Sequence, residues 1–181
     1  MQETSSKLLP TMPIDYCVAD TQGGIGYQIQ TAFQNELIKN NSTKSIVALI
    51  TRCEVSESDP AFNHPTKPIG TFFQYDEIAK KSAVYGWSFV EDSGRGYRRV
   101  VASPKPIKIL EKDSILSLLE NGAIVVATGG GGIPVLKKDS SYVGVEAVID
   151  KDFASSLLAR EIKADYLVIS TGVAHVSLNL G

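Results

Sequence analysis

Four consecutive glycines form the strongest chemical feature of the sequence. Thr128 and the four glycines 129–132 directly follow the apolar, strand-type run 123–127. Because glycine has no Cβ atom, it adopts positive φ and lets the backbone approach a ligand closely. Successive N–H groups in such a loop can surround an anion at the carboxyl end of a sheet. The spacing is neither GxGxxG nor GxxxxGK[ST]. We therefore predict an anion-binding loop of another kind, the alternative being a mobile turn.

A lysine between two aspartates lies at the start of a later predicted helix. Asp150 is suited to the N-cap, and Asp152 falls in the first turn, where a carboxylate is favourable. Lys151 opposes the helix dipole at that end. Its position makes sense if an anion lies between the lysine and the glycines, and the alternative is an ordinary surface lysine.

Two further segments carry cations. Prolines on either side of Lys67 fix the local backbone, which would hold that ammonium group in place; the alternative is a rigid loop with an incidental lysine. Arg95 is the first of three arginines around a glycine turn, and such a cluster can grip a phosphate or a carboxylate. The alternative is a solvated hairpin whose arginines pair with Glu91 and Asp92.

The elements that must position these residues alternate between helix and strand. The predicted order is helix from residue 21 to about 40, strand 45–51, helix 111–120, strand 123–127, helix 152–162, strand 166–170 and a short strand 176–180. The apolar strand runs are typical of strands covered on both faces. We expect an α/β fold: a three-layer αβα arrangement around a mainly parallel central sheet.

One stretch interrupts this alternation. Residues 56–103 are rich in proline, glycine and aromatic residues, and we expect a small protruding subdomain of short strands with one helix near 76–83. It is a candidate lid, and a plain surface excursion fits the pattern equally well. The whole chain, residues 1–181, is predicted to form a single domain around it, with residues 1–15 as a flexible lead or helix remnant.

Composition restricts the class of protein further. The chain has 181 residues, 43% of them apolar, and a formal net charge of −2. It therefore lacks the basic excess of a nucleic-acid binder. Cys17 and Cys53 form no CxxC pair, and we expect both to be free, buried thiols. His64 and His175 show no partner pattern, so no metal-ligating residues are predicted. The N-terminus is not a secretory signal and no apolar run is long enough for a membrane span, so we expect no membrane association and a cytoplasmic location.

The chemical segments occur in one order that is specific in combination. CVADTQGGIGYQIQ is followed by HPTKPIG, EDSGRGYRRVVASPKPI, GGGGIPV and VEAVIDKDFASSLLAREIKADYLVISTGV. The series closely resembles carbamate kinase, within the amino acid kinase superfamily, from about residue 12 to residue 181. The resemblance implies reversible phosphoryl transfer between ATP and carbamate, which gives ADP and carbamoyl phosphate in the breakdown of arginine or other carbamoyl compounds. It implies Mg²⁺ with the nucleotide and a homodimer.

The resemblance also implies roles for individual residues. Lys151 would neutralise charge on the phosphoryl group in flight, Asp152 would hold the catalytic lysines, and Lys67 would close over the substrate from the subdomain. The substrate and phosphoryl group would lie against a loop formed by Gly129, Gly130, Gly131 and Gly132, and Arg95 is the further candidate phosphate ligand. The nucleotide would be approached by Thr171, Gly172 and Val173.

The sequence departs from the family pattern in ways that bear on activity. The family's Gly-Gly-Asn and His-Gly-Asn-Gly-Pro loops and its Gly-Ser-Met-Leu-Pro-Lys motif are absent, and Ala174 stands where the family often has Asp. Two alternatives to a kinase follow: a non-catalytic relative, and a module that binds carbamoyl phosphate without transfer. Because the absent strands would leave a sheet edge unpaired, we expect self-association or completion of the fold by a partner chain.

Overall fold

The computed structural model describes residues 12–172 as an α/β protein. Its helices are α1 (Ile14–Lys39), α2 (Tyr75–Tyr85), α3 (Lys112–Glu120) and α4 (Lys151–Glu161), with 3-10 turns η1 (Pro60–Phe62) and η2 (Gly129–Gly131). Its strands are β1 (Ile46–Ala48), β2 (Arg52–Val55), β3 (Lys67–Phe73), β4 (Ser88–Glu91), β5 (Tyr97–Val101), β6 (Pro106–Ile109), β7 (Ile124–Val126), β8 (Ile133–Lys138) and β9 (Ser141–Gly144).

Two parallel ladders form the centre of the molecule. β1 pairs with β7, and β2 pairs with β8. The ladders follow each other along the same two chain segments, since Leu49 N donates to Val126 O and Ile133 N donates to Thr51 O, both at 2.9 Å. Antiparallel strands flank them: β6 lies beside β2, and β9 returns beside β8. The predicted α/β class is confirmed, with mixed sheets: the β1–β7 and β2–β8 pairs are parallel, and the β2–β6 and β8–β9 pairs are antiparallel. For β8–β9 the tight turn permits only antiparallel pairing.

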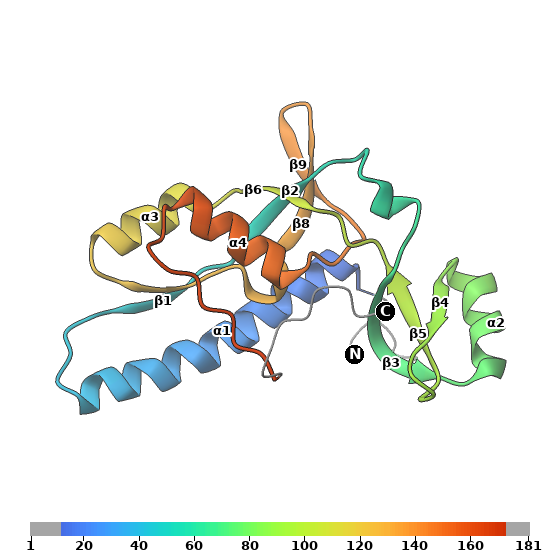
Figure 1. The fold of residues 1–181 in the computed structure, drawn as a ribbon, viewed down its shortest axis with the longest axis horizontal. Helices are drawn as coiled ribbons and strands as arrows, with labels where there is room; N and C mark the ends of the chain where they lie inside the picture. The colour runs from blue at the N-terminus through green and yellow to red at the C-terminus, as the bar shows by residue number, and fades with distance from the viewer. Residues whose placement is uncertain (1–11, 173–181) are drawn as a thin grey trace.

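Helices cover these strands from two sides. In Figure 1, α1 runs below β1 and β7, whereas α3 and α4 lie above the strands. A hydrophobic core cluster lies between α3, α4 and the four-stranded sheet. It contains Cys53, Val55, Ile109, Ile115, Ile149, Ala154 and Leu157. The core therefore sits directly beneath the helix that begins at Lys151.

A small antiparallel sheet, β3–β5–β4, forms a separate layer together with α2 at the right of Figure 1. α2 begins with a capping box between Gln74 and Glu77, which confirms the helix predicted near 76–83. Aromatic residues of this layer pack on one another. Phe73 lies edge-on to Phe89 with ring centroids 5.6 Å apart, and Trp87 stacks on Tyr85 with ring centroids 4.8 Å apart. The subdomain boundaries 56–103 stay a prediction.

Several predicted elements differ at their ends. α1 begins at Ile14, well before residue 21, because the chain turns into the helix directly after Pro13. The strand predicted over 45–51 ends at Ala48, where the chain bends toward the second ladder, and Ile50 is half exposed. Cys53 is fully buried as expected, whereas Cys17 is only partly buried on α1.

The prediction of a strand over residues 166–170 is wrong. This segment is irregular, and Val168 is 88% exposed. Its composition is that of a strand, but a strand also needs a neighbour, and none of the described strands pairs with it. The strand predicted over 176–180 lies outside the described residues.

A matched pair of isoleucines on β6 tests this core. Ile109 is fully buried and Ile107, two residues earlier, is 52% exposed. We expect Ile109→Ala to lower the free energy of unfolding by about 2–5 kcal/mol, because it leaves a cavity. Ile107→Ala should change it by no more than about 0.5 kcal/mol. Urea denaturation of both variants measures this, and equal losses would contradict the difference in burial between the two side chains.

Candidate active site

The candidate site is built around residues 128–132, here called the Gly loop, which connects β7 to β8. Four of its five residues have positive φ: Thr128 (51°), Gly130 (67°), Gly131 (103°) and Gly132 (86°). This left-handed backbone is what the run of glycines permits. A side chain on most of these positions would strain the loop.

Two of the glycines are also required by close packing. A Cβ atom on Gly131 would lie 2.2 Å from the carbonyl oxygen of Ile149, and one on Gly132 would lie 2.6 Å from Sγ of Cys53. Both distances are far below van der Waals contact. A Cβ atom on Gly130, by contrast, would meet nothing within 4 Å. The loop therefore presses its last two glycines onto β2 and the entry to α4, and leaves Gly130 open to a ligand.

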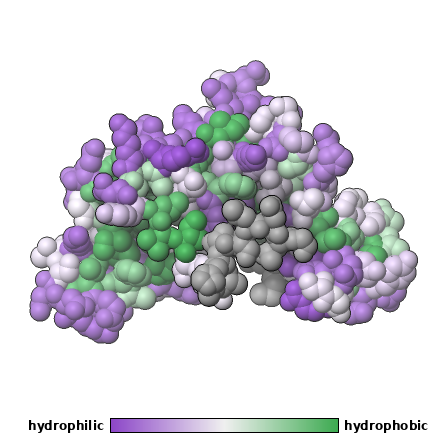
Figure 2. Space-filling model, viewed as in Figure 1, coloured by the Kyte–Doolittle hydropathy of each residue, from purple (hydrophilic) through white to green (hydrophobic). Residues whose placement is uncertain are grey.

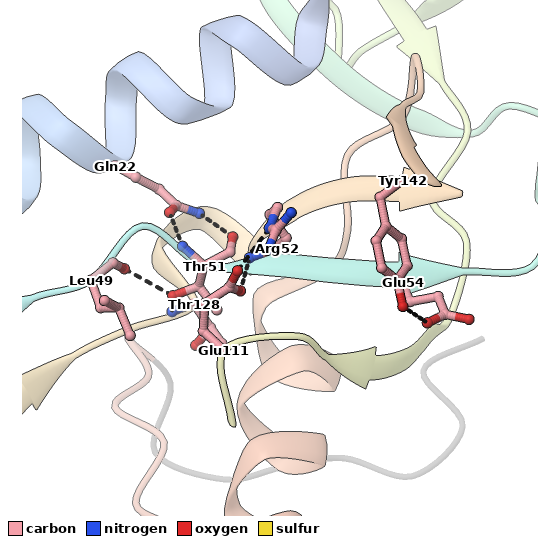
Figure 3. Close-up of polar contacts among 8 residues, drawn as sticks. All are labelled: Gln22, Leu49, Thr51, Arg52, Glu54, Glu111, Thr128 and Tyr142. Atoms are coloured by element: carbon pink, nitrogen blue, oxygen red, sulfur yellow. Dashed lines mark hydrogen bonds and ion pairs between the residues drawn. The ribbon is translucent and has the colours of Figure 1, made fainter. Parts of the chain in front are cut away.

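A buried amide network fixes where the loop begins (Figure 3). Gln22 of α1 accepts a hydrogen bond from Thr51 N at 2.8 Å and donates to Thr51 O at 3.2 Å and to Gly129 O at 3.0 Å. The hydroxyl of Thr51 accepts from Thr128 N at 3.0 Å. Both Gln22 and Thr51 are buried. The loop is thus held by a side chain of α1 and one of the β1–β2 connection. Within the loop, Gly131 N donates to Thr128 O at 2.9 Å and Gly132 N donates to Gly129 O at 3.3 Å, so the N–H groups of Gly129 and Gly130 are the candidates for a ligand.

The start of α4 places two lysine–aspartate pairs beside the loop. Asp150 caps the helix, since its Oδ1 accepts from Asp152 N at 2.9 Å. Its Oδ2 pairs with Nζ of Lys67, the first residue of β3, at 2.9 Å. Lys151 pairs with Asp152 at 3.0 Å. The resemblance assigned both lysines to Asp152, whereas in the structure Lys67 is held by Asp150.

A cavity of about 200 Å³ lies between α1, β3 and the Gly loop. Gly129 and Gly130 line it on one side and Ile69 and Gly70 of β3 on another. Val18 of α1 lies on a further wall. The cavity therefore joins the exposed part of the Gly loop to the strand that carries Lys67.

The structure does not bring Arg95 to this cavity. In the β3–β5 ladder, Lys67 pairs with Val101 and Phe73 pairs with Tyr97, so the β4–β5 turn lies at the opposite end from Lys67. Arg95 pairs with Asp92 at 3.2 Å and stacks over Phe72 at 4.8 Å. The solvated-hairpin alternative describes these contacts.

The predicted nucleotide residues lie at the far end of the described chain. Thr171 and Gly172 are exposed and belong to no helix or strand, and Val173 lies outside the described residues. The structure therefore places Lys67, Lys151 and Asp152 at the start of α4, next to Ile149, against which the Gly loop packs. The nucleotide role of the other residues stays a prediction.

Charges at the start of α4 stabilise one another. The hydrogen bond from Lys67, followed by that from the Asp152 backbone, lowers the pKa of Asp150 below its usual value. The hydrogen bond to Asp152 and the charge of that carboxylate raise the pKa of Lys151. Asp150 is therefore ionised and Lys151 protonated at neutral pH, which suits an anion-binding role for the lysine.

Cys53 is not a nucleophile in this site. Burial, with a smaller effect of the Glu111 and Glu161 carboxylates, raises the pKa of its thiol to about 12. The protonated thiol instead donates to Gly131 O at 3.2 Å. Cys53 thus adds one more contact that fixes the Gly loop.

Sequence reasoning missed Gln22 and Thr51. Both are common polar residue types, and neither belongs to a recognisable motif. The available signal was weak: Gln22 lies in the quoted segment CVADTQGGIGYQIQ, and Thr51 ends a strand-type run just before the chain must turn. Only their spatial neighbours reveal their role.

Neither a metal-ligand cluster nor a membrane-spanning helix is found among residues 12–172. No group of three or more His, Cys, Asp or Glu side chains is gathered there as a metal site. Within the same range, none of the helices combines the length and apolarity needed to cross a bilayer.

Comparison with known proteins places the chain in a family. Its sequence matches the amino acid kinase family over residues 14–179. It is 54% identical over 177 residues to the carbamate kinase-like protein YahI of Escherichia coli and 51% identical over 172 residues to carbamate kinase 3 of Staphylococcus aureus. These alignments cover 96% and 95% of this chain but 55% and 56% of the relatives. The chain thus spans about half the length of the curated relatives it matches.

Solved structures agree with the sequence comparison. The carbamate kinase of Giardia lamblia bound to AMP-PNP superposes with a TM-score of 0.86 at 40% identity, over 95% of this chain and 55% of that one. An Aeropyrum pernix K1 protein, solved as project APE1968, superposes with a TM-score of 0.91 at 40% identity, over 99% and 58%.

Fold and site together define an α/β protein in which a glycine loop packs against the start of a lysine-bearing helix, and a small antiparallel sheet is linked to that helix start through Lys67. The family match extends over nearly all of the chain, so the chain belongs to the amino acid kinase family. Within that family it is similar to carbamate kinases over about half of their length.

The two central glycines of the loop provide a direct test of its geometry. Gly131→Ala places a methyl group against the Ile149 carbonyl, and we expect it to lower the free energy of unfolding by more than about 3 kcal/mol. Gly130→Ala meets only the cost of a left-handed alanine, about 1–2 kcal/mol. Thermal and urea denaturation compare the two. A Gly130→Ala variant less stable than Gly131→Ala would overturn the assigned orientation of the loop.

Proposed function

We propose that the chain supplies the phosphoryl-transfer part of a carbamate kinase site, acting between ATP and carbamate to give ADP and carbamoyl phosphate. The observation that carries the proposal is the convergence of Lys67, Lys151 and the Gly loop at the start of α4. The similarity to carbamate kinases, with 51% sequence identity to one of them, supports the choice of reaction. The breakdown of arginine or other carbamoyl compounds is the proposed setting.

Electrostatics and positioning account for the chemistry in this proposal. A phosphoryl group in transfer carries charge on its equatorial oxygens, and an enzyme lowers the barrier mainly by placing donors and cations around it. Lys151 and Lys67 supply the cations. The N–H groups of Gly129 and Gly130 are the proposed donors of the Gly loop, because those of Thr128, Gly131 and Gly132 already donate within the protein. The proposed arrangement asks for no covalent intermediate with the protein.

The proposal also includes Mg²⁺ bound with the nucleotide. Mg²⁺ in kinases is usually held by substrate phosphates and one or two carboxylates, with water completing the octahedron. Asp152, half exposed beside Lys151, is a carboxylate of the required type. Bound Mg²⁺ would neutralise phosphate charge, and the nucleotide itself is proposed to lie near Thr171, Gly172 and Val173. Because ATP and ADP are its substrates, we propose a cytoplasmic location.

The assay of ATP formation from ADP, Mg²⁺ and carbamoyl phosphate tests this function. We expect turnover by the protein, and a loss of about 10²–10³-fold in kcat for Lys151→Ala, the size seen when one preorganised charge-stabilising group is removed. Lys44→Ala, which changes an exposed lysine before β1, is the matched control and should keep full activity.

Two results would contradict the proposal. Equal activity of the Lys151→Ala variant and the unaltered protein would remove that lysine from the chemistry. Folded protein that binds carbamoyl phosphate without turnover would instead support the binding-module alternative.

We further propose that the protein forms a homodimer through α1. This helix exposes Tyr27, Phe33 and Ile38, each more than half accessible. Figure 2 shows apolar residues gathered left of the centre of the molecule. In the same view, Figure 1 draws α1 and the segment after α4 in this region. Apolar patches of this kind commonly mark association surfaces.

Sedimentation analysis measures the proposed assembly. We expect a mass of twice the 19.5 kDa of the chain. Phe33→Asp on α1 should shift the population toward monomer, whereas Tyr85→Asp on α2, at the same 52% exposure, should not. A protein that sediments as a 19.5 kDa monomer at all concentrations would contradict the dimer.

A further inference from the structure

The ion pair between Lys67 and Asp150 joins two parts of the molecule that are 83 residues apart in sequence. Lys67 opens β3 of the small sheet, and Asp150 caps α4 of the main fold. Their Nζ and Oδ2 atoms lie 2.9 Å apart. Both side chains are about one-third exposed, so the contact is reachable by solvent and by small ligands.

Asp150 makes two contacts with two different oxygens. Oδ1 accepts from Asp152 N and fixes the first turn of α4, whereas Oδ2 faces Lys67. A cap alone requires one oxygen, and serine or asparagine would provide it equally well. Capping requires neither the second oxygen nor the negative charge of Asp150. Both contribute to the ion pair with Lys67.

The central strand of the small sheet, β5, is attached differently. β5 runs on into the main fold, where Ala102 forms a parallel bridge with Ala147 and its carbonyl accepts from Val148 N at 3.0 Å. Arg99 pairs with Glu146 at 2.8 Å. β5 is therefore attached through both its backbone and the Arg99 side chain, whereas β3, which lines the cavity with Ile69 and Gly70, is attached to α4 through the Lys67 side chain.

We infer that Asp150 is a positioning residue that holds Lys67, and with it β3, beside the Gly loop. Its two oxygens couple the helix start that carries Lys151 to the strand that carries Lys67, and residues 69 and 70 of that strand line the cavity. Any action of Lys67 on a phosphoryl group rests on the proposed function. The coupling itself is a property of the fold and has a readout that needs no turnover.

Three variants separate the coupling from the helix cap. Asp150→Ser keeps a strong N-cap residue but has no charge and no reach to Lys67. Lys67→Gln breaks the same pair from β3 and leaves α4 untouched. Asp150→Asn keeps the cap and a neutral acceptor, so it should fall between the unaltered protein and Asp150→Ser.

Amide hydrogen exchange of the full chain measures the coupling. We expect amides of residues 67–73 to exchange about 2- to 5-fold faster in both Asp150→Ser and Lys67→Gln, the range for a partly exposed ion pair. Exchange in α4 should stay unchanged in both. Unaltered exchange over residues 67–73 in Lys67→Gln would overturn the inference, as would an Asp150→Ser effect confined to α4. If Asp150→Ser does not fold, Lys67→Gln still decides the matter.

Kinetics provide the second readout where the protein turns over. Because Asp150 acts through Lys67, kcat of the Asp150→Ser, Lys67→Gln double variant should equal that of Lys67→Gln alone. Losses that multiply would show that Asp150 acts independently, which would overturn the inference. Faster exchange in β3 without turnover by the unaltered protein would reject the proposed function and leave the role of Asp150 supported.

Discussion

The buried Thr51 is the junction on which the rest of the structure depends. Its N–H and carbonyl are both engaged by the Gln22 side chain, and its hydroxyl accepts from Thr128 N and donates to Leu49 O. A buried polar group left without a partner costs about 1–3 kcal/mol, so these bonds strongly favour one arrangement. At this point the first parallel ladder gives way to the second. The same bonds set where the Gly loop leaves the sheet.

Steric fit then carries that position to the start of α4. Gly131 lies against the carbonyl of Ile149, and Gly132 against the thiol of Cys53, with no room for a side chain at either glycine. Ile149 is fully buried and directly precedes Asp150, so the loop and the helix start move as one body. The positions of Lys151 and Lys67 depend on this contact between the loop and the helix start. This rigidity is what an anion site requires, because preorganised donors need little rearrangement when charge develops.

How much of this could be predicted from sequence depends on how local each signal is. The Gly loop and the Asp150 cap follow from residue type at the end of a strand or the start of a helix, and both were predicted. Gln22 could not be, because a glutamine in the middle of a helix is indistinguishable from a solvated one until its neighbours are known. The segment 166–170 failed for a related reason: its composition is that of a strand, but pairing depends on residues elsewhere in the chain.

The most direct test of the account is to locate where carbamoyl phosphate binds, by titrating it into ¹⁵N-labelled protein and following the backbone amide signals. The account predicts saturable shifts at the amides of residues 129–132 and in the first turn of α4, and a weaker response in a Gln22→Leu variant, whose loop has lost its anchor. Saturable shifts confined to the β4–β5 turn around Arg95, with the Gly loop unaffected, would contradict it.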